Sequence, residues 1–142
     1  MMELAIEEAL KSGSDIPVGA VIVKDGKIIS SSCNKREKYS DITAHAEILA
    51  IKEAEKVIDN WRLDGCEMYV TLEPCPMCAW AIIQSRISTV YFGSYDINYG
   101  AFGSKLDLRS LVNSKLKVYG GIKEDECNKL LENYFNKIRS KN

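Results

Sequence analysis

The sequence predicts an α/β protein, in which helices cover both faces of a mixed five-stranded sheet to give a three-layer α/β/α sandwich. The main observation is that short β-branched stretches alternate with segments whose apolar residues recur at helical spacing. Along the chain the expected elements follow the order α-β-β-α-β-α-β-α-β-α. A second observation is the length, because 142 residues suffice for one domain with its own core, here residues 1–142.

The first elements are an amphipathic helix and a hairpin. Apolar residues between positions 5 and 10 have helical spacing, and the Gly-Ser-Asp run at 13–15 ends that helix. Residues 18–23 form a dense β-branched run, and Lys-Asp-Gly-Lys at 24–27 is typical of a hairpin turn. The return strand therefore starts at Ile28, and the charged residues that follow it, Asn34 to Ser40, are expected to form a loop.

A central helix and strand follow. Thr43 is expected to be the N-cap of a helix at about residues 44–57, which has a broad apolar face. Asp64-Gly65 interrupts the chain before a strand at 68–72.

The last part of the chain continues the alternation. Pro76 suits the first turn of a helix at about residues 77–85, because the N–H that proline lacks has no partner there. A strand is expected at 89–93 and a glycine-bearing loop at 95–104. The remaining elements are a short helix, a short strand and a terminal helix with an apolar stripe, at residues 106–111, 116–119 and 130–138.

The composition is that of an ordinary globular protein, with 46% hydrophobic and 27% charged residues. No apolar run approaches the roughly 18 residues of a membrane span. The first ten residues carry three glutamates and no basic residue, which is the wrong charge for a secretory or mitochondrial leader. We therefore expect a cytoplasmic protein without a membrane partner.

Charge is distributed unevenly along the chain. Residues 1–104 hold 10 basic and 15 acidic residues, whereas residues 105–142 hold 9 basic and 5 acidic ones. The last third is thus net positive although the whole chain is at −1. This excess predicts either a solvated helix face or a surface that faces phosphates, and charge alone does not decide between them.

Two short motifs carry the chemistry of the sequence. His45-Ala46-Glu47 offers an imidazole and a carboxylate, and Cys75 and Cys78 offer two thiols at C-x-x-C spacing. One nitrogen and two sulfurs suit a tetrahedral Zn²⁺ whose fourth position is left for water. A redox pair would leave His45 and Glu47 without a role, and a purely structural zinc would need a fourth ligand, for which Cys66 is the nearby candidate.

The spacing of the first motif restricts its geometry. Residues two apart point to different sides of a helix interior, so His45 and Glu47 converge only if they lie in a first turn. With Thr43 as N-cap they would lie there, and two helix N-termini would meet at the ends of strands. Zinc would lower the pKa of its water toward 7, and Glu47 would carry protons to the substrate and then to its leaving amine.

The chain has five cysteines, an odd number that does not suggest a disulfide framework. Cys33, Cys66 and Cys127 stand alone in apolar or mixed surroundings. We expect these three to be buried as small hydrophobic residues.

The pairing of H-x-E with P-C-x-x-C is the signature of zinc nucleobase deaminases. The chain resembles, over nearly its whole length, the bacterial tRNA-specific adenosine deaminases of the cytidine/deoxycytidylate deaminase superfamily. The resemblance rests on the two motifs and on further segments, at residues 15–20, 34, 43–48, 61–63, 69–79, 85–87, 92–93 and 100–104. It implies a cytidine deaminase-like fold and hydrolytic deamination of adenosine to inosine at the wobble position of a tRNA anticodon.

The resemblance also implies partners and residue roles. It implies a homodimer with one Zn²⁺ per subunit, bound by His45, Cys75 and Cys78, and a tRNA anticodon stem-loop as the substrate. Asn34 would hydrogen-bond the flipped base, and Asp96 would line the groove for flanking nucleotides. The residues that would grip the stem-loop lie on the terminal helix: Tyr134, Phe135, Lys137 and Arg139.

Each of these substrate contacts has a simpler alternative. Asn34 and Asp96 are also common turn residues, and Tyr134-Phe135 also suits a core position. The chain departs from the family pattern at Ile42, at Trp80, whose bulk must pack away from the site or against a partner, and at Asn113-Ser114, whose loop looks shortened.

Two other functions remain open from the sequence. A free nucleobase or nucleoside deaminase of the guanine or cytosine type would share the zinc chemistry but has no use for the basic last third. A non-catalytic, zinc-stabilised RNA-binding subunit would not need Glu47.

Overall fold

The computed structural model describes residues 1–140 and contains a mixed five-stranded sheet in the order β2-β1-β3-β4-β5. The strands are β1 (Gly19–Lys24), β2 (Lys27–Cys33), β3 (Cys66–Leu72), β4 (Thr89–Ser94) and β5 (Lys117–Tyr119). β1 pairs antiparallel with β2 and with β3, whereas β3–β4 and β4–β5 are parallel. The predicted α/β class and mixed five-stranded sheet are confirmed.

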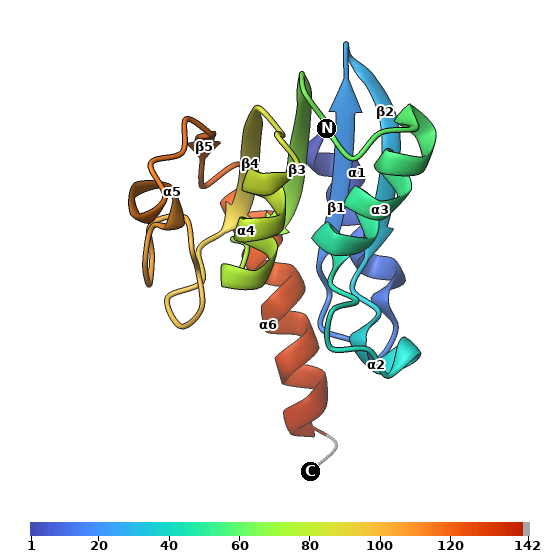
Figure 1. Cartoon of the computed structure of the whole chain (residues 1–142). Helices are drawn as coiled ribbons and strands as arrows, with labels where there is room; N and C mark the ends of the chain where they lie inside the picture. The colour runs from blue at the N-terminus through green and yellow to red at the C-terminus, as the bar shows by residue number, and fades with distance from the viewer. Residues whose placement is uncertain (141–142) are drawn as a thin grey trace.

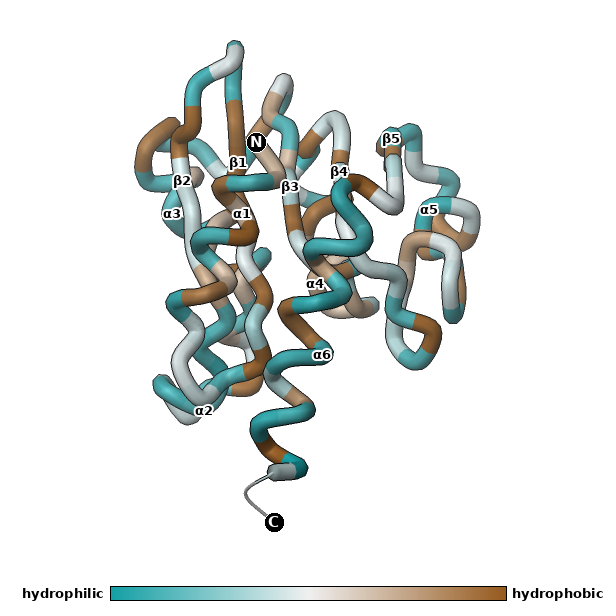
Figure 2. The backbone as a smooth tube through the Cα atoms, turned by 180° about the vertical axis from the view of Figure 1, so that it is seen from behind, coloured by the Kyte–Doolittle hydropathy of each residue, from teal (hydrophilic) through white to brown (hydrophobic). Residues whose placement is uncertain are grey.

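Helices cover both faces of this sheet, as Figures 1 and 2 show from opposite sides. α3 (Ala46–Ile58) and α4 (Pro76–Gln84) pack on one face. α1 (Met2–Ala9), continued by the 3₁₀ turn η1 (Leu10–Ser12), and α6 (Glu124–Ser140) pack on the other. α2 (Arg36–Tyr39) and α5 (Leu108–Leu111) are single turns in the connections.

The residues of β1 explain why the sheet is enclosed on both sides. Ala20 and Ile22 point into the core beneath α3 and α4, whereas Val21 and Val23 point into the smaller core beneath α1 and α6. All four are buried. A strand that is buried on both faces reads as a continuous hydrophobic run rather than an alternating one, as residues 20–23 do.

The connections bring two helix starts together. The chain crosses from β3 through α4 to the parallel strand β4, and α4 begins just beyond the end of β3. α3 packs beside α4 and on β1 and β2. The N-termini of α3 and α4 therefore meet at the C-terminal end of the central strand β3.

Two predictions about this region are wrong. The expected loop at residues 34–40 contains α2, because the buried carboxylate of Asp15 accepts hydrogen bonds from the N–H groups of Glu37 and Lys38, at 2.7 and 3.3 Å. Thr43 is not the N-cap of α3, because its N–H and hydroxyl donate to the Asp41 carboxylate instead. His45 is the N-cap residue.

The cysteines outside the C-x-x-C motif behave as expected. Cys33, Cys66 and Cys127 are buried, with at most 4% of their surface exposed. Among residues 1–140, no helix combines the length and the apolar character that a membrane span requires. Lys141, which belongs to the basic last third of the sequence, lies outside the described residues.

Candidate active site

His45, Cys75 and Cys78 converge although 30 or more residues separate the histidine from the cysteines. The Nδ1 atom of His45 lies 3.8 Å from Sγ of Cys75 and 3.5 Å from Sγ of Cys78. All three candidate ligand atoms lie within 4.8 Å of one another. The three residues predicted as metal ligands therefore form one cluster.

Local backbone geometry produces this convergence. His45 and Cys75 are the N-cap residues of α3 and α4, and both have extended φ/ψ angles that turn the side chain away from the helix axis. Pro76 occupies the first turn of α4, as expected. Cys78 follows in the same turn, so its sulfur lies on the side of α4 where Cys75 lies.

The cluster fits a zinc ion. Tetrahedral Zn–N and Zn–S bonds of about 2.0–2.1 and 2.3 Å place nitrogen and sulfur ligands roughly 3.5–3.6 Å apart. The observed separations of 3.5 and 3.8 Å agree with that geometry. Cys66 is not part of the cluster, so the described residues provide three ligands and leave a tetrahedral site open at its fourth position.

The electrostatics of the two thiols suit a metal ligand pair. Hydrogen bonds from Cys78 and from His45 lower the pKa of Cys75 to about 4, so this group is a thiolate at neutral pH. The hydrogen bond to Cys75 and burial in turn raise the pKa of Cys78. The pKa of His45 is raised by the hydrogen bond between its ring and Cys75. A metal ion would draw both sulfurs into the thiolate form.

Glu47 lies beside the cluster in the first turn of α3. Only 4% of its surface is exposed. Burial raises the pKa of its carboxyl to about 7. A carboxyl that titrates near neutral pH can both take up and release a proton under ordinary conditions, which is what a general base and acid must do.

A cavity of about 440 Å³ opens beside these groups. It brings together three predicted residues of the metal and proton chemistry, His45, Glu47 and Cys75, with the two predicted substrate contacts Asn34 and Asp96. Further lining residues come from the flanking loops and strands: Ile16, Val18, Arg36, Ile42, Ala46, Leu72, Glu73, Pro76, Met77 and Tyr99. Its volume is typical of sites that bind small organic groups.

Asn34 holds together two segments of this wall. Its Nδ2 donates to the Ile16 carbonyl at 3.2 Å, and its Oδ1 accepts from the N–H of Arg36 at 3.3 Å. The amide keeps one further hydrogen and one further lone pair for a ligand. Asp96 uses one carboxylate oxygen to accept from the N–H groups of Asn98 and Tyr99, both at 3.1 Å.

The predicted contacts on the terminal helix do not line the cavity. Tyr134 is half-buried and donates its hydroxyl to the Ser14 carbonyl, whereas the neighbouring Phe135 ring is 44% exposed. Lys137 and Arg139 are exposed. Figure 1 shows that this end of α6 extends beyond the sheet at the end of the molecule where α2 lies.

Three residues of the cavity had no role assigned from the sequence. Arg36 belongs to the turn that was expected to be loop, and Tyr99 lies in the glycine-bearing loop. Glu73 lies within the family-like segment 69–79, where a carboxylate between a buried strand and a metal ligand is itself a signal. Neither turn nor loop has a periodicity that would mark these positions.

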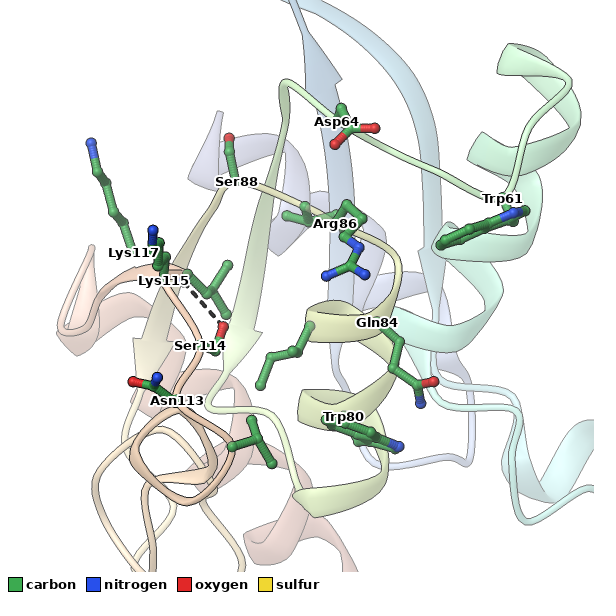
Figure 3. Close-up of a pocket in the computed structure, with 14 residues that line it drawn as sticks. Trp61, Asp64, Trp80, Gln84, Arg86, Ser88, Asn113, Ser114, Lys115 and Lys117 are labelled. Carbon is green, nitrogen blue, oxygen red and sulfur yellow. Dashed lines mark hydrogen bonds between the residues drawn. The ribbon is translucent and has the colours of Figure 1, made fainter.

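A second hollow of about 800 Å³ lies on the other side of α4. Figure 3 shows Trp80 and Gln84 from α4 beside Trp61, with Asn113 and Ser114 on the opposite wall. Trp80 therefore packs away from the metal cluster, which was one of the two expected outcomes, and is 43% exposed.

Comparisons with known proteins agree with this site. Residues 1–94 match the family model of the cytidine and deoxycytidylate deaminase zinc-binding region. The chain is 42% identical to a tRNA-specific adenosine deaminase of Bacillus subtilis, over 99% of this chain and 89% of that protein. A solved structure from a study of A-to-I editing by tRNA:A34 deaminases superposes with a TM-score of 0.83 at 40% identity, covering 92% of this chain and 97% of the other.

A guanine deaminase structure from Bacillus subtilis is also similar, at 41% identity and a TM-score of 0.63, but the match covers only 66% of this chain and 62% of the other. The similarity to the tRNA enzymes extends over nearly the whole length of both partners. The chain belongs to the zinc-binding cytidine and deoxycytidylate deaminase family and, within it, to the tRNA-specific adenosine deaminases.

Proposed function

We propose that this chain deaminates adenosine to inosine at the wobble position of a tRNA anticodon, using one Zn²⁺ per subunit. The observation that carries the proposal is the three-ligand cluster, which opens onto a cavity beside a buried carboxylate, Glu47. A protein with this proposed role would act in the cytoplasm, where tRNA is processed.

His45, Cys75 and Cys78 would hold the metal. When bound, Zn²⁺ lowers the pKa of a water toward 7 and so makes water nucleophilic at neutral pH. Glu47 takes a proton from this water and delivers it to the ring nitrogen next to the carbon that bears the amino group. The water oxygen would then bond to that carbon, and Glu47 would carry the second proton of that oxygen to the amine, so that the C–N bond breaks, ammonia leaves and a carbonyl replaces the amine.

The cavity has the volume of a site for a small organic group, so the target adenine would leave its stack to enter it. Asn34 would hydrogen-bond that base through the amide hydrogen and lone pair that its protein contacts leave free. The apolar lining, which includes Val18, Ile42 and Leu72, would replace the stacking that the base loses.

Nucleotides beside the target would lie along the mouth of the cavity. Asp96 and Tyr99 on one side and Arg36 on the other offer an acceptor, an aromatic ring and a cation. Splayed loop bases of RNA are recognised by such stacking and hydrogen-bonding groups. The residues that would contact the stem of the anticodon stem-loop lie in the second half of α6: Tyr134, Phe135, Lys137 and Arg139.

The proposed assembly is a homodimer. The hollow in Figure 3 carries two partly exposed tryptophans, Trp61 at 55% and Trp80 at 43%, and Val112 at 40%. Large aromatic side chains exposed together are typical of interface cores rather than of free surface. A second copy of the chain would cover them.

The two alternatives predict different substrates or none. A free guanine or cytosine deaminase would not need the exposed groups along the cavity mouth or the basic end of α6. A non-catalytic subunit would have no reason to keep Glu47 buried at a cost in solvation beside the metal ligands.

The test is a deamination assay with zinc-loaded protein on two sets of substrates. One is an anticodon stem-loop with adenosine at the wobble position, and the other consists of free guanine, cytosine and nucleosides. Inosine in the stem-loop alone is the expected result. Turnover of a free base with none on RNA would overturn the substrate, and no turnover at all with zinc bound would favour the non-catalytic alternative.

A further inference from the structure

Glu73 is a buried carboxylate that the proposed chemistry does not use. Only 1% of its surface is exposed, and it lies between the end of β3 and the metal ligand Cys75. Oε1 accepts from the N–H of Asp96 at 3.1 Å and from the hydroxyl of Ser104. Oε2 accepts from the N–H groups of Phe102 and Ser104, both at 3.1 Å. These four donors offset the cost of burying the carboxylate.

All four donors belong to one segment, residues 95–104, which we call the mouth loop. The loop is tied to the metal-ligand segment a second time, because the N–H of Ala101 donates to the Pro74 carbonyl at 2.9 Å. It is also packed against the carboxylate. A Cβ atom on Gly100 would lie 2.4 Å from Cδ of Glu73 and 2.5 Å from the Asp96 carbonyl, so the loop closes around Glu73 too tightly for a side chain there.

The mouth loop forms one side of the cavity entrance. It contributes Asp96 and Tyr99 to the lining. The Tyr99 side chain is 69% exposed, although a tyrosine ring is largely apolar. Because Asp96 caps the N–H of Tyr99, both residues are placed by the same loop conformation, and that conformation is set by the bonds to Glu73.

We propose that Glu73 is a positioning residue, which fixes the mouth loop so that the Tyr99 ring stands ready to stack on a nucleotide next to the reacting base. This inference rests on the proposed function, since it requires an RNA substrate with flanking nucleotides. A loop that is ordered before RNA arrives spares the free energy of ordering it on binding. Glu73 itself touches no substrate, because its oxygens are directed to the loop.

The discriminating substitution is Glu73→Gln, which keeps the volume but exchanges one acceptor oxygen for an NH₂ group. That NH₂ would face N–H donors, so about half of the four bonds would be lost. The matched control is Glu67→Gln on β3, the strand that precedes Glu73, where the carboxylate accepts from the Tyr91 hydroxyl and does not contact the mouth loop. Ser104→Ala removes one donor from the loop side and serves as a second, milder variant.

The experiment measures kcat and KM of zinc-loaded protein on the anticodon stem-loop for Glu73→Gln, for Tyr99→Ala and for the double variant. Each single variant should raise KM roughly tenfold, the order of one base–aromatic stack, while kcat stays within about threefold. The double variant should be no worse than Glu73→Gln, because a loose loop no longer presents Tyr99. Glu67→Gln should match the unmodified protein.

Amide hydrogen exchange provides a readout that needs no substrate. The N–H groups of residues 96–104 should exchange faster in Glu73→Gln, and to a smaller degree in Ser104→Ala, with the strands unchanged. The inference would be overturned if the KM increase of the double variant equalled the product of the two single increases. It would also be overturned if amide hydrogen exchange in the mouth loop were the same in Glu73→Gln as in the unmodified protein. If the unmodified protein formed no inosine while the loop exchange responded as expected, the proposed function would fail and the anchoring role of Glu73 would stand.

Discussion

At the scale of single residues, burial and neighbouring groups shift the pKa values of two site residues in opposite directions. The pKa of Cys75 falls to about 4, whereas that of Glu47 rises to about 7. The first change favours a metal-binding thiolate, and the second favours a carboxyl that exchanges protons near neutral pH. Opposite changes within one cavity are typical of a division of roles between binding and proton transfer.

Glu47→Gln tests this division. We expect turnover of the stem-loop to fall by about 10²–10⁴-fold, because the amide cannot carry the proton, whereas zinc content and RNA affinity should stay unchanged. Glu53→Gln on the same helix is the control, since Glu53 is exposed and outside the cavity. The measurements are kcat, zinc by metal analysis and stem-loop affinity. Deamination at the original rate in Glu47→Gln would contradict the assigned role.

At the scale of elements, much of the architecture could be predicted because it follows from local patterns. The hairpin of β1 and β2, the start of α4 at Pro76 and the five strands all have signals in adjacent residues. The misplaced N-cap at Thr43 and the missed α2 have different causes. Thr43 hydrogen-bonds the nearby Asp41 carboxylate, two residues away, instead of capping the helix. The turn α2 depends on a distant residue, because Asp15 lies 22 residues before the N–H of Glu37 that it accepts from.

The site shows the same limit. His45, Glu47, Cys75 and Cys78 could be selected because their types and spacing are those of a metal site. Glu73 could not be given a role, because its four donors lie 23 to 31 residues further along the chain and only the folded loop brings them together. Sequence spacing reveals ligands of a shared ion better than it reveals partners of a buried carboxylate.

The end of α6 should contribute to RNA binding through charge. Lys137 and Arg139 are exposed on the part of the helix that extends past the sheet. The double variant Lys137→Gln/Arg139→Gln should lower the slope of log Kd against log salt by about 1.4–1.8, as expected for two lost phosphate contacts. Titrations at several salt concentrations measure this slope.

Lys27→Gln/Lys56→Gln is the matched control for that experiment. Both lysines are exposed, one at the start of β2 and the other near the end of α3, away from the helix starts that form the site. An equal fall of the slope in the two double variants would show that the helix end has no particular part in RNA binding.

At the scale of the whole molecule, the metal should link the two helices that supply its ligands. Zinc that binds only the folded chain adds about 2.7 kcal/mol when its concentration is 100-fold above its Kd. For a chain of this size, a chelator should then lower Tm by roughly 5–10 °C. His45→Ala should show a far smaller change with chelator, because it lacks one ligand. Calorimetry measures Tm with and without chelator. If chelator lowered Tm equally in the unmodified protein and in His45→Ala, the metal would bind elsewhere.

Self-association is the other property of the whole molecule that the surface predicts. If Trp61 and Trp80 lie in the core of a dimer interface, each should contribute about 2 kcal/mol or more, so Trp61→Ala/Trp80→Ala should raise the dimer Kd by roughly 10³-fold or more. Leu10→Ala is the control, because Leu10 is 70% exposed on the opposite face of the sheet. Sedimentation velocity over a concentration series measures the equilibrium. If the unmodified protein were monomeric at micromolar concentration, the proposed dimer would be contradicted. If the dimer Kd were unaffected by the two substitutions, the interface would lie on another face, because aromatic anchors cannot be removed from an interface core without loss of affinity.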